Sequence, residues 1–274
     1  MINRTRGADT FLYAVAGIVT LFFVTPLLWV FSSAFKTRLE IFTIPPVWFP
    51  SGLYLANFQA VLDRNVPFLL NSMIVTLAAT AGVMLIAIPA AFALSFFGYK
   101  RKKDLEIWVL STRMMPPIAA AVPLFLVGQV LGLVDTRIGL ILLYVGFNLP
   151  FAIWLLTSFF RDLPGSVLEA AIVDGASWGQ VLRKIVLPLS SSGISTVAIF
   201  TAIFSWNELL LPLFFTNRQA KTFSVVLTEF QGQTNTVWEQ MSAAVVIQVI
   251  PVVVLTLLAQ RYIVSGLTLG AVKE

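Results

Sequence analysis

Side chains able to do chemistry are scarce in this sequence and fall in two kinds of place. One is the polar segment 169–188, which reads EAAIVDGASWGQVLRKIVLP and carries two carboxylates among small residues. The other is a set of polar and aromatic side chains within otherwise apolar runs: Asn71, Asn148, Trp154, Trp206, Asn207 and Glu208. Carboxylates suit charge-assisted hydrogen bonds to a basic partner, and amides suit the hydroxyl groups of a solute. The pattern favours contact and binding over covalent chemistry.

Several catalytic classes are excluded by composition. The chain contains no histidine and no cysteine, which removes the commonest general base, the commonest metal ligand and every thiolate site. One G-x-S-x-G match occurs at 175–179, but a nucleophile elbow requires a strand-to-helix turn and a histidine partner. No phosphate-binding G-x-x-x-x-G-K-[ST] loop is present. We therefore expect a chain that is not an enzyme and holds neither metal nor cofactor of its own.

The elements that position these residues are predicted to be membrane helices. Of 274 residues, 58% are hydrophobic and 11% charged, against about 25% charged in soluble domains. A helix needs about 20 apolar residues to cross a bilayer. Six largely uncharged runs meet this length, the third interrupted by Arg113 and Pro116-Pro117: 11–35, 68–97, 107–134, 138–160, 189–211 and 240–260. The prediction is an all-α integral membrane protein with six spans in one domain, 1–274.

The distribution of basic residues predicts the orientation. Eleven Lys and Arg residues fall at the termini and in the segments 98–106 and 161–188, while six fall in the other connecting segments. Because basic residues concentrate on the cytoplasmic side, both termini and the 161–188 loop are expected to be cytoplasmic. The remaining loop 36–65 is rich in proline and aromatic residues and is expected to cap the opposite surface.

The 161–188 loop has more predicted structure than a connection between two spans requires. Pro164 favours the start of a short helix through Glu169, and Asp174-Gly175 interrupts it. A second amphipathic helix is predicted from 176 to 188, with Asp174 as its N-cap. A few polar residues would suffice merely to join two spans. We infer that another molecule docks on this loop.

At these residues the chain resembles the permease subunits of bacterial binding-protein-dependent ABC importers. The signature of that family is EAA, three residues, Gly, nine residues, Ile-x-Leu-Pro. It is matched without a gap by Glu169, Ala170, Ala171, Gly175, Ile185, Leu187 and Pro188. The stretches LNSMIVTL at 70–77, WNELLLPLFFT at 206–216 and RYIVSGLTLGAVKE at 261–274 are similar to the maltose-type sugar and polyol branch.

The resemblance implies a type I importer permease (MetI-like) fold. It implies that 161–188 forms a coupling helix seated in a cleft of a cytoplasmic ATPase, with Glu169, Ala170, Ala171, Asp174 and Gly175 at the contact. The implied partners are a second permease as a heterodimer, two ATPase subunits that hold ATP and Mg, and an extracytoplasmic solute-binding protein. The implied location is the bacterial inner membrane, with lipid and no nucleic acid as surroundings.

The expected function is import of a sugar or polyol, driven by ATP hydrolysis on a separate chain. The alternatives are an ABC permease for a polyamine, phosphate or glycerol phosphate, or a secondary transporter. Anionic cargo favours several inward-facing basic residues, and only Arg113 lies within a span. A secondary transporter typically needs ion-coupling carboxylates near the midplane. Hydrogen bonding between helices explains the six polar and aromatic path candidates equally well, so their role stays open.

Overall fold

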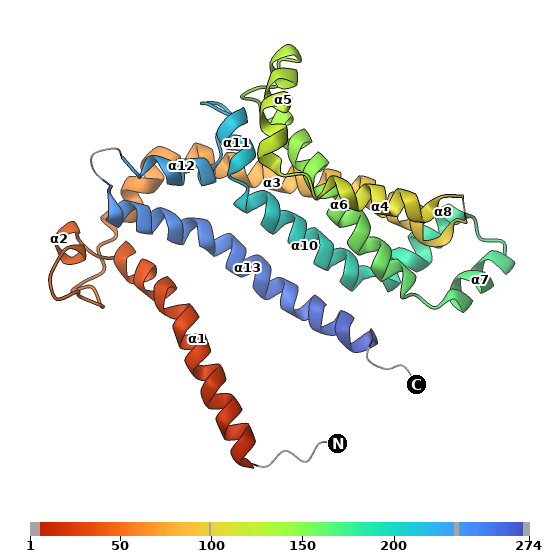
Figure 1. The fold of residues 1–274 in the computed structure, drawn as a ribbon, viewed down its shortest axis with the longest axis horizontal. Coiled ribbons are helices and arrows are strands. Elements are labelled where there is room, and N and C mark those ends of the chain that lie inside the picture. The colour runs from red at the N-terminus through yellow and green to blue at the C-terminus, as the bar shows by residue number, and fades with distance from the viewer. Residues whose placement is uncertain (1–5, 99, 233–235, 271–274) are drawn as a thin grey trace. The chain divides into compact units, whose positions relative to one another are not determined.

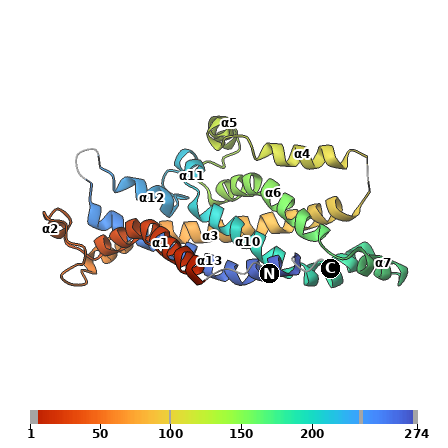
Figure 2. The ribbon, with the colours of Figure 1, turned by 60° about the horizontal axis from the view of Figure 1, so that its bottom comes forward.

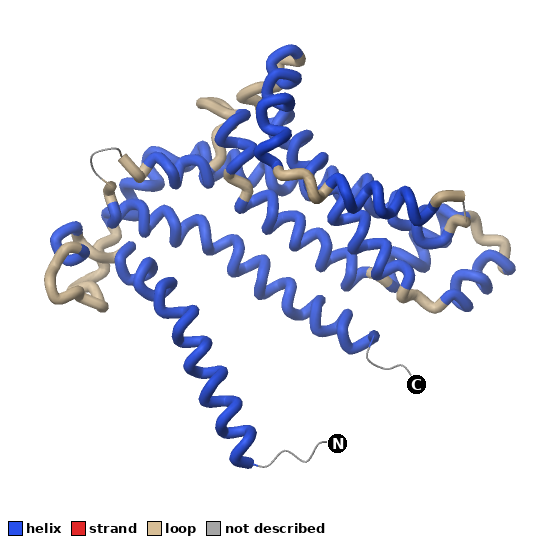
Figure 3. The backbone as a smooth tube through the Cα atoms, in the orientation of Figure 1, coloured by secondary structure: helices blue, strands red, loops and turns tan. Residues whose placement is uncertain are grey.

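Helices account for nearly all of the regular structure. The computed structural model describes residues 6–98, 100–232 and 236–270, so the predicted topology signals at Arg4 and Lys273 lie outside the described residues. Within that part of the chain there is no strand, and one isolated antiparallel bridge joins Gln231 and Thr236 (Figure 3). The helical elements are α1 Arg6–Ala34, α2 Arg38–Ile41, α3 Ala56–Phe96, α4 Lys102–Thr112, α5 Pro117–Val130, α6 Arg137–Arg161, α7 Gly165–Val173, α8 Trp178–Val181, the π-helical turn η1 Leu182–Val186, α9 Leu187–Leu189, α10 Ser191–Asn207, α11 Leu210–Phe215, α12 Phe223–Glu229 and α13 Trp238–Gly270 (Figure 1).

The predicted spans correspond to long helices or to bent helix pairs. Four described stretches are long and apolar enough to cross a membrane: Thr10–Ala34, Ala56–Phe96, Arg137–Arg161 and Trp238–Gln260. Two further pairs, α4 with α5 and Trp178–Leu189 with α10, pass the same test but bend by 86° and 79°. If each bent pair is one span, the described part of the chain has six, the number that hydropathy predicts.

The break in the third predicted span follows from its prolines. Pro116 disfavours helical geometry at Met115, and Pro117 takes the first position of α5, where a missing N–H costs nothing. Helix α4 therefore ends at Thr112 and α5 starts in a new direction (Figure 2). Helix α3 begins at Ala56, twelve residues before the predicted second span, and contains nearly all of that span. Charged Asp63 and Arg64 lower hydropathy there without ending the helix.

The chain forms two compact units, one of which contains residues 1–66 and 227–250. In this unit the segment that follows α1 is folded back on itself. Lys36 is fully buried, donates from Nζ to the Val47 carbonyl at 2.5 Å and lies 4.1 Å from the centre of the Trp29 ring. Burial lowers the pKa of Lys36, and Glu40 partly opposes this effect. Hydrogen bonds from Ser51 and Thr37 lower the pKa of Glu40 to about 2, so the loop is held by a buried cation and an ionised carboxylate.

The second unit contains residues 67–226 and 251–274 and holds the segment 169–188. Its largest apolar core is built by α3, α6 and α10 together with the α7–η1 region. Small residues of α3, such as Ala87 and Ala91, are fully buried against larger α6 side chains such as Leu156 and Phe160. Close packing of small residues is a common way for membrane helices to associate. The core thereby connects the polar segment to the spanning helices.

Candidate coupling site and solute cavity

The first half of the 169–188 segment is a helix closed by a left-handed glycine. Helix α7 ends where Gly175 adopts φ +82°, a conformation that glycine adopts readily and side-chain-bearing residues rarely do. The Gly175 N–H donates to the Ile172 carbonyl and the Ala176 N–H to the Ala171 carbonyl, both at 3.0 Å. This pairing is a Schellman motif, which satisfies carbonyls left open at a helix end. The predicted interruption at Gly175 therefore lies where the backbone requires glycine.

The prediction that Asp174 caps the second helix was wrong. Asp174 is the C-cap of α7, and its backbone N–H donates to the Ala170 carbonyl at 2.9 Å. The N-cap of α8 is Ser177, whose hydroxyl accepts from the Gln180 N–H while the Gln180 side chain accepts from the Ser177 N–H at 2.8 Å. The Schellman turn occupies the residues after Asp174, so the N-cap of the next helix lies three residues later, at Ser177.

Most of the predicted coupling residues face solvent in this unit. Glu169, Ala170, Asp174 and Gly175 are exposed, and Ala171 is half-buried. Toward the other end of the segment, Ile185 and Leu187 are half-buried and Pro188 is exposed, with Ile185 packed against the core. Figure 1 shows α7 beyond α8 at one end of the unit, and Figure 2 also shows α7 at an end. The segment thus presents a small-residue surface with carboxylates, accessible to a second molecule.

The inner face of the 169–188 segment, with Leu168 directly before it, packs against the apolar core of the second unit. Leu168 of α7 is 6% exposed, while Val181 and Val186 are fully buried, and all three belong to the core that contains Phe160. Trp178 adds an aromatic contact, with its ring 4.9 Å from that of Phe97 near the end of α3 in an edge-on arrangement. Sequence reasoning missed Trp178, although an aromatic residue directly after a helix cap is a visible signal. Packed side chains therefore connect α7 and α8 to α3 and α6.

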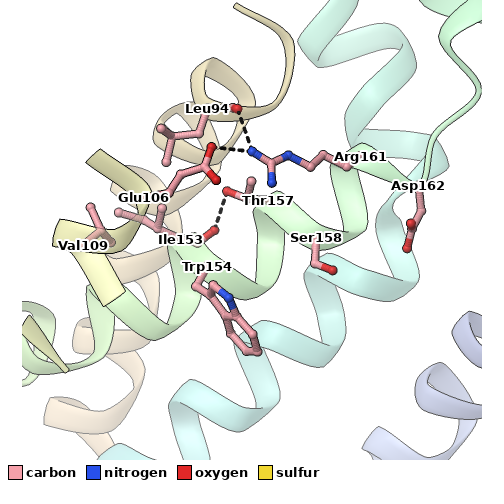
Figure 4. A pocket seen from close by; sticks show the side chains of 9 residues that line it. All are labelled: Leu94, Glu106, Val109, Ile153, Trp154, Thr157, Ser158, Arg161 and Asp162. Atoms are coloured by element: carbon pink, nitrogen blue, oxygen red, sulfur yellow. Dashed lines mark hydrogen bonds and ion pairs between the residues drawn. The ribbon is translucent and has the colours of Figure 1, made fainter. Parts of the chain in front are cut away.

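An ion pair lies at the same end of α6. Arg161, the last residue of α6, pairs with Glu106 of α4 and donates to the Leu94 carbonyl at 3.4 Å (Figure 4). These residues border a cavity of about 300 Å³ that is also lined by Trp154 and Asp162. Figure 4 shows the Trp154 ring pointing away from the ion pair. Sequence reasoning missed this pair because its members are 55 positions apart.

A second cavity, of about 330 Å³, collects three of the six predicted path residues. Asn148 of α6, Asn207 at the end of α10 and Glu208 directly after it all line this space, together with Arg113 and Tyr144. Glu208 caps α11, since its Oε1 accepts from the N–H groups of Leu210 and Leu211 at 3.0 and 3.1 Å. The cavity combines amides, both signs of charge and aromatic walls.

The other three predicted path residues lie elsewhere. Trp154 is half exposed at the first cavity, and Trp206 is 4% exposed within the protein. Asn71 holds a connecting loop in place: its Nδ2 donates to the carbonyls of Gln219 and Lys221 at 2.8 and 2.9 Å, and its Oδ1 accepts from Arg137. The bond from Arg137 of α6 is the hydrogen bonding between helices that was the alternative explanation for Asn71, and the other two bonds join α3 to the loop.

Asp135 completes the attachment of this loop. Its carboxylate accepts from the consecutive backbone N–H groups of residues 217–220 at 2.9 to 3.1 Å. Partial burial acts to raise the pKa of Asp135, but these four donors together lower it below its usual value. Asp135 itself adopts φ +56°, which aspartate tolerates better than most residues. The α5–α6 turn is therefore shaped to present this carboxylate to the loop.

Comparison with known proteins decides the family. The family described as binding-protein-dependent transport system inner membrane component matches residues 84–269, which include the 169–188 segment and both cavities. The chain belongs to this family. The predicted recognition is confirmed, and membership makes the chain a membrane component of a transport system.

Individual relatives are similar in sequence along nearly the whole chain. The trehalose transport system permease protein SugB of Mycobacterium tuberculosis is 36% identical over 255 residues, covering 90% of this chain and 92% of that protein. The sulfoquinovosyl glycerol transport system permease protein SmoH of Agrobacterium fabrum is 34% identical over 264 residues, covering 95% and 93%. A bacterial ABC transporter involved in the import of alginate superposes with a TM-score of 0.78 at 22% identity, covering 96% of this chain and 99% of that one. The type I importer permease fold is thereby confirmed.

Proposed function

We propose that this permease moves a sugar or polyol inward across a bacterial inner membrane, powered by ATP hydrolysis on a separate ATPase subunit. Relatives named for trehalose and for sulfoquinovosyl glycerol support a hydroxyl-rich cargo. The chain then needs no ATP, Mg or other cofactor of its own. We propose that residues 1–274 act as one permease domain with both termini on the cytoplasmic side.

The observation that carries this function is the α7–α9 segment, which has one face exposed to solvent and the other packed against the apolar core. Glu169 and Asp174 offer carboxylates to a basic cleft, and the small residues between them allow close backbone approach. Beneath them, Leu168 and Val181 belong to the same packed core as Phe160 of α6. Protein interiors are close-packed and transmit displacement with little compression. Closure of an ATPase pair on α7 would therefore move α6 and α3 together.

The proposed partners follow from this arrangement. We expect a second permease that forms a heterodimer with this chain, two ATPase subunits at the coupling segment and an extracytoplasmic solute-binding protein. A solved structure of similar fold is a bacterial alginate ABC transporter in complex with an alginate pentasaccharide-bound periplasmic protein, which supports the expected solute-binding protein. Ile185, Leu187 and Pro188 are proposed to fix the coupling segment on the membrane helices, while Glu169 through Gly175 make the contact.

The test is purification of the tagged protein from native membranes in mild detergent, with co-purifying chains identified by mass spectrometry. Recovery of an ATPase and a second permease is the expected result. Recovery of the protein alone, or as a stable homodimer without an ATPase, would contradict the proposal and favour a secondary transporter.

Two variants make the test specific to the coupling segment. Glu169→Lys reverses the charge of an exposed carboxylate on α7, and Asp104→Lys makes the same change at an exposed carboxylate on α4, outside the 169–188 segment. Glu169→Lys should reach the membrane in normal amounts but lose its ATPase and its transport, whereas Asp104→Lys should keep both. Gly175→Asp should resemble Glu169→Lys, because it places a side chain at φ +82° in the same turn. If Glu169→Lys recovered as much ATPase as the wild type, the proposal that α7 contacts the ATPase would be wrong.

A further inference from the structure

Two basic segments that are far apart in the sequence meet at one end of the second unit. The ring of Trp178, the first residue of α8, lies 4.9 Å from that of Phe97 and 6.1 Å from that of Phe92. The first basic segment, 100–103, begins three positions after Phe97, and the second, Arg183-Lys184 of η1, begins five positions after Trp178. Figure 1 shows α8 at the same end of the unit as the start of α4. The aromatic contact therefore holds the two basic segments close to each other.

Most of the six cations in these segments point into solvent. Lys102 is half-buried, and its Nζ donates to the Ser95 carbonyl near the end of α3 at 3.1 Å, so the fold itself uses this cation. The other five are exposed: Lys100, Arg101, Lys103, Arg183 and Lys184. Clustered charges of one sign raise the local potential and attract counter-ions. An anion is therefore the natural ligand of this surface.

Carboxylates within the chain compensate little of this charge. Asp104 is the one carboxylate in the segments 100–104 and 178–186. The nearest others along the chain are Glu106, which pairs with Arg161, and Asp174 in the turn that closes α7. The two segments together therefore keep a clear excess of positive charge.

Helix α4 adds an apolar surface next to the cations. Lys103, Ile107 and Leu110 are spaced four and three positions apart, so they lie on one face of α4. Lys103 is exposed, as are Ile107 at 67% and Leu110 at 41%. The eleven residues of α4 span about 16 Å, roughly half of a hydrocarbon core of about 30 Å. This face thus has a cation at one end and an apolar stripe about one leaflet long.

We propose that the two basic segments bind the phosphate headgroup of an anionic phospholipid, whose acyl chain lies along Ile107 and Leu110 of α4. A phospholipid supplies both chemistries that this surface offers, whereas a soluble anion would leave the apolar stripe uncovered. Basic clusters beside membrane helices attract anionic lipids in this way. The inference goes beyond the proposed transport function and does not depend on the cargo. The bound lipid would join η1 of the proposed coupling segment to α4.

The experiment uses the full-length protein, purified with the subunits that accompany it and stripped of native lipid in mild detergent. Phosphatidylglycerol or phosphatidylcholine is added in steps, and native mass spectrometry counts the lipids that stay bound. Phosphatidylglycerol should bind at least about fivefold more tightly, the contribution of one basic residue near a membrane surface. It should also raise the melting temperature, since a ligand of the folded state stabilises it. Added salt should weaken this binding.

Two double variants locate the headgroup. Lys100→Gln with Lys103→Gln removes two exposed cations before and within α4, and Arg183→Gln with Lys184→Gln removes the two of η1. Each pair should weaken phosphatidylglycerol binding by about tenfold or more, because each cation contributes about fivefold. Binding of phosphatidylcholine should stay the same in both.

Two matched controls separate the site from general charge and from folding. Arg64→Gln with Arg218→Gln also removes two exposed cations, but outside both basic segments, and should leave phosphatidylglycerol binding unchanged. Lys100→Arg with Lys103→Arg alters the same positions while keeping their charge, and should bind phosphatidylglycerol as the wild type does. Loss of binding in the glutamine pair alone is then an effect of charge.

Each contrary result overturns the lipid site for a different reason. Equal affinity for the two lipids would show that the surface does not recognise headgroup charge. Displacement of phosphatidylglycerol by an equal concentration of inorganic phosphate would assign the cations to a soluble anion. Wild-type lipid binding in both glutamine pairs, with loss of a co-purifying subunit, would assign them to an acidic protein surface. None of these results would contradict the importer function, which the recovery of an ATPase tests separately.

Discussion

Two glycines of α6 offer a matched measurement of how tightly the second unit is packed. A β-carbon at Gly139 would lie 2.3 Å from the Leu133 carbonyl oxygen and 2.8 Å from the Phe215 ring. A β-carbon at Gly146, on the same helix, would meet nothing within 4 Å. The carbonyl at Leu133 cannot move freely, since it accepts from the Thr136 N–H at 3.3 Å and from the Thr136 hydroxyl at 2.6 Å. Gly139→Ala should therefore strain the α5–α6 turn.

The size of the effect follows from two opposing contributions. Replacing glycine by alanine in a helix stabilises it by about 0.5–1 kcal/mol. Overpacking typically costs about 1–3 kcal/mol, and the predicted contact is more than about 1 Å shorter than an optimal one. Both variants share the helix contribution, so the difference between them isolates the strain. Gly139→Ala should be less stable than Gly146→Ala by about 1–3 kcal/mol.

The assay is unfolding of each purified variant in mixed micelles by increasing SDS, followed by tryptophan fluorescence and far-ultraviolet circular dichroism. Gly146→Ala should match or exceed the wild type, and Gly139→Ala should unfold at lower SDS. Equal midpoints for the two variants would show that the Gly139 contact relaxes at no cost. That result would refute the close approach of α6 to the turn before it.

Three further predictions concern the second unit. Asp135→Asn removes the charge that four backbone N–H groups bind, and should lower the free energy of unfolding by about 1–3 kcal/mol. Because the pKa of Asp135 is depressed in the folded protein, the stability advantage of the wild type should be full above about pH 4 and vanish as pH falls through that folded pKa. SDS unfolding measured across this pH range tests the prediction. Trp178→Ala should raise the mobility of a spin label attached at Asp174→Cys. The label needs no prior removal of cysteines, because the chain has none. An unchanged electron paramagnetic resonance spectrum would contradict the role of Trp178 in anchoring this segment. Glu106→Gln should cost less than about 1 kcal/mol in the same unfolding assay, since Arg161 and Glu106 are partly solvated, and a larger loss would contradict that estimate.

Features carried by local chemistry could be predicted from the sequence. Hydropathy indicated the long helices, and Pro116-Pro117 indicated the break between α4 and α5. The EAA signature located the segment that the structure shows exposed on one side and packed on the other. Gly175 was expected to interrupt the helix, and its left-handed backbone does so. In each case the structural feature is determined by residues that lie within a few positions of it in the sequence.

Errors and omissions arose where two local options competed or where distant segments meet. Asp174 and Ser177 are both good N-caps by residue type, but Ser177 has Gln180 three positions later, which completes a capping box that Asp174 lacks. No local pattern marks Tyr144 as a cavity residue, and Arg113 is marked only as a charge within a span, because the cavity that they line is assembled from α6, α10, α11 and the α4–α5 bend. Asn71 illustrates the same limit, since its two loop partners are about 150 positions away.

Helix α6 joins the cavity of about 330 Å³ to the proposed coupling segment. Tyr144 and Asn148 line the cavity, while Phe160, twelve residues beyond Asn148, lies in the core that anchors α7 and η1. At 1.5 Å per residue that separation is about 18 Å along one helix axis. A tilt imposed at Phe160 would therefore move the cavity wall without any further linkage. Pro150 lies between the two sites and removes one backbone hydrogen bond from α6. Bending of α6 at Pro150 is therefore the easiest way to uncouple the cavity from the core around Phe160.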